Sequence, residues 1–205
     1  MLDQKGFDLW ADEYDKAVGL SDEEDTYPFA GYKKILGKMY KRIMEKPNAV
    51  VLDIGFGTGT LTRKLYENGC LIYGQDFSSR MIEIASAKMP AAHFYQGDFT
   101  QGLVEGLKQK SYDFMIAAYS IHHLTDDQKL VFFRDLFNCL KEDGKILIGD
   151  VMFATRNELN QCKEESNDSW DDDECYCVVE ELALEFPNIS FEKVTFCSGI
   201  LTLSK

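Results

Sequence analysis

The chain has 205 residues, 45% of them hydrophobic and 13% aromatic, which suits a single globular domain with a core of its own. Its net charge of -13 argues against a nucleic-acid partner, because such a protein needs a basic face to displace counterions from phosphates. No apolar run reaches the ~18 residues that span a bilayer, and the N-terminus lacks the basic-then-apolar order of a signal peptide. We therefore expect a cytoplasmic protein that does not contact membranes and acts on a small molecule.

The six cysteines are scattered along the chain. The one close pair, Cys175 and Cys177, has C-x-C spacing and not the C-x-x-C spacing of a zinc or redox site. In a cytosolic protein such residues are most simply reduced thiols. We therefore expect neither a disulfide nor a metal site.

The N-terminal part is predicted to be helical. Large apolar residues recur every three or four positions over residues 7–18, which predicts an amphipathic helix. After an acidic, turn-prone stretch at 19–28, a second helix is expected over about 30–46, where Pro47 stops it. We expect residues 1–46 to form a helical lid on a core that spans the rest of the chain.

From residue 47 onward the pattern alternates between strands and helices. Short β-branched or aromatic runs predict strands at 49–54, 70–76, 93–95, 112–118 and 145–150. The stretches between them predict helices through Leu61 and Leu65, over about 78–88 behind a Ser78 cap, and from Asp126 or Asp127 as cap to Leu140. Such alternation predicts βαβ units and a parallel sheet with helices on both faces.

The C-terminal part ends differently. After a helix through Val178 and Leu182, two strands are expected at 189–196 and 199–203, and their short connection requires them to be antiparallel. The predicted fold is a doubly wound α/β domain. Its seven-stranded Rossmann-like sheet is mostly parallel and closes with an antiparallel C-terminal hairpin. A core over 47–205 would carry a lid insert at about 155–176.

A glycine-rich loop follows the first strand. Gly55, Gly57 and Gly59 allow a tight turn and the close approach of a ligand. A dinucleotide fingerprint would need glycine at position 60, where this chain has Thr60. Asp53, two residues ahead of the loop, suits a cationic ligand better than a pyrophosphate. The loop by itself leaves NAD and a sulfonium cofactor as alternatives.

Residues 51–59, Val-Leu-Asp-Ile-Gly-Phe-Gly-Thr-Gly, resemble the first motif of class I S-adenosylmethionine-dependent methyltransferases. The stretches 75–78, 97–99, 112–124 and 140–145 resemble later motifs of that family in the same order. The resemblance implies S-adenosylmethionine as cofactor, with Asp76 on the ribose hydroxyls, Asp98 on the adenine amino group and Phe99 on the ring. The implied cofactor site comprises Tyr14, Asp53, Gly55, Gly57, Gly59, Asp76, Phe77, Met81, Asp98, Phe99 and Ala118.

The first predicted helix resembles that of a smaller group within this family. Its pattern F-x-x-W-A-x-x-Y-D, with Phe7, Trp10 and Tyr14, is similar to that of small uncharacterised bacterial methyltransferases related to the ubiquinone and menaquinone methyltransferase group. The resemblance implies that Tyr14 reaches the methionine end of the cofactor, where its ring would favour the sulfonium. The alternative is that the three aromatic residues form one packed stripe.

The implied reaction is methyl transfer by in-line displacement, in which a general base is needed only when the acceptor must lose a proton. His122 and His123 follow the fourth strand and are candidates for that base, with Asp150 and Tyr119 as further candidates. A structural role in ordering the loop is the alternative for both histidines. The acidic residues at 22–25 and 171–174 either attract a cationic substrate or form solvated surface.

Two other functions compete with that of a methyltransferase for a small molecule. One is a protein that binds S-adenosylmethionine without catalysis. The other is an NAD-dependent oxidoreductase, which Thr60 and the antiparallel hairpin disfavour. The methyl acceptor and the oligomeric state are not predicted.

Overall fold

The computed structural model describes residues 26–205, built around one β-sheet with the strand order β3-β2-β1-β4-β5-β8-β7. Its parallel strands are β1 (Val50–Ile54), β2 (Leu71–Asp76), β3 (His93–Gln96), β4 (Tyr112–Ala118) and β5 (Leu140–Phe153). β7 (Ile189–Lys193) and β8 (Ser198–Ser204) form an antiparallel hairpin whose β8 pairs antiparallel with β5. The predicted sheet is confirmed. An eighth, two-residue strand, β6 (Cys177–Val178), pairs with the end of β5.

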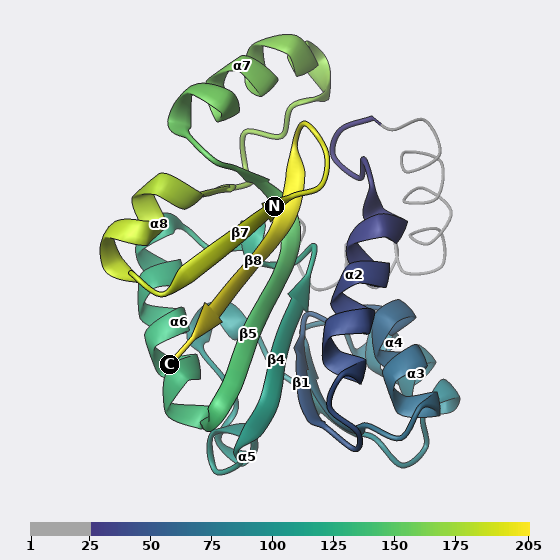
Figure 1. The fold of residues 1–205 in the computed structure, drawn as a ribbon. Coiled ribbons are helices and arrows are strands. Elements are labelled where there is room, and N and C mark those ends of the chain that lie inside the picture. Colours follow the sequence, from purple (N-terminus) through teal and green to yellow (C-terminus); the bar gives the residue numbers. More distant parts are fainter. Residues whose placement is uncertain (1–25) are drawn as a thin grey trace.

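Helices cover both faces of the sheet (Figure 1). One face carries α2 (Tyr32–Met44), α3 (Thr60–Glu67) and α4 (Ser79–Lys88), and the other carries α5 (Glu105–Lys108), α6 (Asp126–Cys139) and α8 (Val179–Glu185). Short 3-10 turns lie at η1 (Phe99–Gln101), η2 (Ile121–His123) and η3 (Asn167–Ser169). Among residues 26–205, no helix combines the length and apolar character needed to cross a bilayer.

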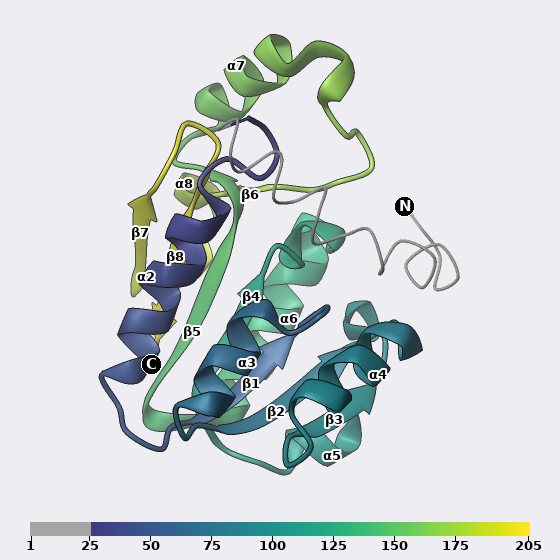
Figure 2. The same ribbon diagram turned by 90° about the vertical axis from the view of Figure 1, so that its right-hand side faces the viewer.

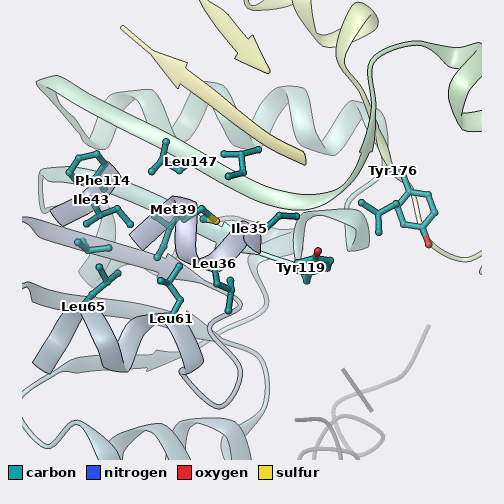
Figure 3. Packing of buried hydrophobic residues seen from close by; sticks show 14 of the residues in the cluster. Ile35, Leu36, Met39, Ile43, Leu61, Leu65, Phe114, Tyr119, Leu147 and Tyr176 are labelled. Carbon is teal, nitrogen blue, oxygen red and sulfur yellow. The ribbon is translucent and has the colours of Figure 1, made fainter. Parts of the chain in front are cut away.

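The α2 helix packs directly on the sheet (Figure 3). Its buried residues Ile35, Met39 and Ile43 belong to the same cluster as Phe114 and Leu147 of the strands. Gly149 of β5 permits this approach, because a Cβ there would lie 2.4 Å from Cγ2 of Ile35. α2 is therefore a core helix, which differs from the expectation that residues 1–46 form a lid.

The other part of that expected lid includes Phe7, Trp10 and Tyr14. These residues lie outside the described part of the chain, so the predicted role of Tyr14 stays a prediction.

Two helix caps test the sequence patterns directly. Ser78 caps α4 as predicted, with its hydroxyl oxygen accepting from the backbone N–H of Met81 at 3.1 Å. For α6, the expectation of Asp126 or Asp127 is wrong. Thr125 caps the helix and forms a reciprocal capping box with Gln128, which leaves both aspartates in the first turn, where the helix dipole favours them.

The segment between β5 and β6 rises beyond the carboxyl ends of the strands (Figures 1 and 2). It begins with α7 (Arg156–Ser166) and returns through η3 to β6. Trp170 anchors the return, since its ring stacks on Tyr27 at 5.3 Å and meets Tyr176 edge-on at 5.0 Å. We call residues 155–176 the insert.

Candidate functional site

A cavity of about 430 Å³ lies where the parallel strands end, within the ~300–1,000 Å³ typical of small-molecule sites. Ligands of open α/β sheets bind at this edge because the strand order reverses there. The cavity is lined by Pro28, Phe29, Gly55, Gly57, Asp76, Phe77, Met81, Asp98, Phe99, Thr100, Tyr119, Ser120, His122, His123, Val151, Asp171, Asp173 and Glu174. The motifs predicted from widely separated parts of the sequence thus share one cavity.

Two glycines of the loop between β1 and α3 have different tasks. Gly55 and Gly57 both have left-handed backbone angles, with φ of 66° and 55°, which other residues adopt only with strain. At Gly55 a Cβ would lie 2.6 Å from Cβ of Ser120, so this glycine is required for packing. At Gly57 a Cβ would meet no atom within 4 Å, so this glycine leaves the cavity open for a ligand.

Asp76 ends β2 and joins the glycine loop to the start of α4. Its Oδ2 accepts from the backbone N–H of Gly57 at 2.8 Å, and its Oδ1 accepts from the backbone N–H of Ser78 at 2.9 Å. The side chain is buried, yet it lines the cavity beside Phe77 and Met81. A carboxylate held by two backbone donors has a fixed direction, which suits it to orient hydroxyl groups of a ligand.

The predicted adenine contacts lie next to Asp76. Asp98 is exposed at the start of η1, where its Oδ1 accepts from the backbone N–H of Thr100 at 2.9 Å. Phe99 is buried, with its ring 6.0 Å from that of Phe132, and it lines the same cavity. An acidic group and an aromatic face therefore stand side by side at this end.

Three predicted cofactor residues lie behind the cavity wall. Gly59 is the N-cap of α3, and Ala118 ends β4. Asp53 is buried in β1, where its Oδ2 accepts from the hydroxyl of Thr62. Its Oδ1 makes no hydrogen bond within residues 26–205. Burial, together with the nearby charge of Asp76, raises the pKa of Asp53 to about 7.

At the opposite end of the cavity, Asp150 of β5 fixes His122. The Oδ1 of Asp150 accepts from Nδ1 of His122 at 2.7 Å, and its Oδ2 accepts from the backbone N–H of Ile121 at 3.0 Å. The second ring nitrogen, Nε2, lies 3.5 Å from Oε1 of Glu174. Both histidines line the cavity, whereas Asp150 lies behind His122 and acts through it.

The two histidines differ in their electrostatics. Burial opposes the charged form of His122, but Asp150 and Glu174 outweigh burial and raise its pKa. Burial and the neighbouring His122 lower the pKa of His123 to about 3. The ring centroids lie 4.3 Å apart, so two imidazoles whose pKa values shift in opposite directions lie in contact.

Several cavity residues were not singled out from the sequence. Pro28, Phe29 and Val151 have no local signal, because their positions depend on how distant segments pack. Glu174 belongs to an acidic run whose placement could not be predicted. Tyr119, a further candidate, lines the cavity with a left-handed φ of 54°, a strained conformation that is frequent at functional sites.

Comparisons with known proteins identify the family. Residues 51–144 match the family described as methyltransferase domain. An uncharacterised methyltransferase of Alkaliphilus oremlandii is 33% identical over 180 residues, covering 88% of this chain and 80% of the relative. One from Geobacillus thermodenitrificans is 34% identical over 193 residues, covering 90% and 86%.

Two solved structures share the fold. A DhpI complex with S-adenosylhomocysteine (SAH) has a TM-score of 0.70 at 19% identity and covers 96% of this chain and 91% of its own. Magnesium protoporphyrin IX methyltransferase from Synechocystis, with bound SAH, has a TM-score of 0.67 at 18% identity and covers 85% and 84%.

The site fits S-adenosylmethionine in several respects. Gly57 leaves open space, Asp76 and Asp98 present acceptors, and the buried Oδ1 of Asp53 suits a nearby positive charge. The prediction of this cofactor is confirmed, and the nicotinamide alternative is set aside. The chain belongs to the class I S-adenosylmethionine-dependent methyltransferases.

Proposed function

We propose that this methyltransferase acts on a small molecule bound between the glycine loop and the histidines. The observation that carries the proposal is the single cavity that contains both Gly57 and His122. When bound, S-adenosylmethionine supplies a methyl group on a positively charged sulfur, which suits in-line displacement. Because the glycine loop and the histidines line one cavity of this size, we expect an acceptor small enough to enter the cavity completely.

The acceptor end supports a small, partly apolar ligand. Pro28, Phe29 and Val151 give it apolar walls, while Asp171 and Glu174 of the insert add carboxylates. The net charge of -13 weighs against RNA or DNA as acceptor. One structural neighbour is a magnesium protoporphyrin IX methyltransferase, whose name implies a small-molecule acceptor for that protein.

His122 is the group we propose to bind the acceptor and to receive its proton. Asp150 holds Nδ1, so Nε2 is the ring nitrogen left to take part. Asp150 is a positioning residue in this scheme, because it touches the imidazole and does not line the cavity. Asp76, Asp98 and Phe99 would hold the cofactor, and the aromatic and apolar walls would exclude water.

The proposal is tested with purified protein and a panel of small acceptors grouped by nucleophile (hydroxyl, amine, thiol and activated carbon). SAH formation is measured with each group, alongside calorimetric binding of SAH itself. We expect turnover with one group only, and at least a tenfold lower kcat for His122→Gln with an unchanged Kd for SAH. Binding of SAH without turnover on any group would instead favour the non-catalytic alternative.

A further inference from the structure

We propose that His122, His123 and Glu174 form a binding site for a divalent transition-metal ion at the acceptor end of the cavity. One nitrogen from each imidazole and one carboxylate oxygen lie within 4.8 Å of one another. All three residues line the cavity, so an ion bound there keeps an open position facing the acceptor. Two histidines and one carboxylate are a ligand set used for catalytic zinc and for non-haem iron.

The separations match the size of such a site. A four-coordinate zinc ion has ligands about 2.0–2.2 Å away, which puts the ligand atoms about 3.4 Å from one another. Nε2 of His122 and Oε1 of Glu174 are already 3.5 Å apart. A pair at the widest separation, 4.8 Å, would need to close by about 1.4 Å, which side-chain rotation can supply.

Both of these ligands are oriented by a second residue. Asp150 accepts from Nδ1 of His122, and the hydroxyl of Tyr176 donates to Oε2 of Glu174 at 2.5 Å. The partners leave Nε2 and Oε1 facing each other. Metal sites commonly use such supporting hydrogen bonds to orient their ligands.

The backbone also holds Glu174 in place although it belongs to a long insert. The N–H of Cys175 donates to the carbonyl oxygen of His122 at 2.8 Å. The carbonyl oxygen of Cys175 accepts from Nζ of Lys129, a lysine with no exposed surface, at 2.6 Å. The segments that carry Glu174 and His122 are thus joined through main chain as well as side chain, so these two ligands are preorganised.

The spacing of the cysteines led us to expect no metal site. The ligands proposed here are not cysteines, and they come from two segments about fifty residues apart, which no local spacing reveals. Resting on the proposed function, the inference adds that the acceptor carries a hydroxyl, amine or thiol able to bind the ion. With the ion bound, Nε2 of His122 would be a ligand and would no longer act as the base. The ion would instead lower the pKa of the bound hydroxyl, amine or thiol, which would release its proton to water before it meets the methyl donor.

The test uses the full chain without a histidine tag, stripped of metal with a chelator and titrated with Co²⁺ and then Zn²⁺. We expect one saturable Co²⁺ site with the absorption of nitrogen and oxygen ligands and no thiolate charge-transfer band. Glu174→Gln should weaken that site at least tenfold, and Tyr176→Phe by roughly 10- to 100-fold. Asp172→Asn, an exposed carboxylate in the same insert, should leave it unchanged.

Three results would overturn the inference. They are the absence of saturable binding, equal affinity of Glu174→Gln and the wild type, and a cobalt spectrum that depends on the neighbouring thiol and disappears in Cys175→Ser. Thermal unfolding of every variant, with and without Zn²⁺, checks that the chain is folded, since a specific ion raises Tm. SAH binding is measured in the same metal-free samples, so a failed metal site is distinguishable from a failed cofactor site.

Discussion

Replacing Asp76 by asparagine tests the cofactor end of the cavity most sharply. The substitution keeps the shape of the side chain but turns one acceptor oxygen into an amide donor. Both oxygens now accept backbone N–H groups, from Gly57 and from Ser78, so in the variant one donor keeps only a neutral acceptor and the other faces an NH2 group. Hydroxyls of a bound ribose would lose the same carboxylate.

A hydrogen bond to a charged group contributes about 1.5–3 kcal/mol, and its loss corresponds to about a 10- to 150-fold rise in Kd. We therefore expect SAH to bind to Asp76→Asn with a Kd raised by that factor in isothermal titration calorimetry. Urea unfolding followed by circular dichroism separates this effect from a loss of stability, because the glycine loop also depends on Asp76.

Asp113→Asn is the matched control. Asp113 is a buried carboxylate at the opposite end of β4, and it likewise accepts from a backbone N–H, that of Val50, at 2.7 Å. Asp113 forms ion pairs with Lys46 and Lys141, so we expect it to contribute to stability. It does not line the cavity. We expect this variant to lose stability and to keep the wild-type Kd. Equal SAH affinity for Asp76→Asn and the wild type would refute the assigned role of Asp76.

Three further predictions concern the loop, a buried acid and a helix cap. Gly57→Ala should raise the Kd for SAH at least tenfold and lower stability by about 1–2 kcal/mol, because alanine is strained at the left-handed φ of Gly57. The control Gly37→Ala, on the exposed side of α2, should raise stability by about 0.5–1 kcal/mol and leave SAH binding unchanged. Similar Kd values for the two variants would contradict this prediction. The pKa of Asp53 is about 7 in the folded chain against 3.8 for the free group, so folding favours its protonated form, and stability should fall as pH rises from about 4 to 7. Urea unfolding at several pH values should show this slope in the wild type and a flatter one in Asp53→Asn, and parallel curves would count against the raised pKa. Thr125→Ala should destabilise the protein by about 1 kcal/mol through loss of the α6 cap, with SAH affinity unaffected in calorimetry; no change in the urea midpoint would mean that the cap contributes nothing.

The sheet was largely predictable because its signals are local. β4 has the predicted bounds, and the short link between β7 and β8 required an antiparallel hairpin. The position of the cavity was predictable as well, since parallel strands bring Gly55, Asp76 and Asp98 to one edge whatever the detailed packing. The α6 cap was mispredicted for a local reason, because Thr125 and Gln128 form a reciprocal pair that a search for aspartate overlooks.

Other features depend on contacts between distant segments. An apolar helix face over residues 32–44 suits a lid and a core layer equally well, and only the close approach of Ile35 to Gly149 decides for the core. The sequence leaves two alternatives for the acidic run at 171–174, a solvated surface or a region that attracts a cationic substrate, and it does not indicate that Glu174 meets His122.

By itself, the sequence predicted the cofactor, through motifs that resemble those of a known family, and it predicted the edge of the sheet where the cavity lies, because strand order and glycine turns are encoded in short stretches. The tertiary structure decided what faces the acceptor. Trp170 stacking on Tyr27, and the ties of Cys175 to His122 and Lys129, bring Glu174 against a histidine about fifty residues away. Packing of that kind depends on the whole folded chain, so no local sequence pattern predicts it.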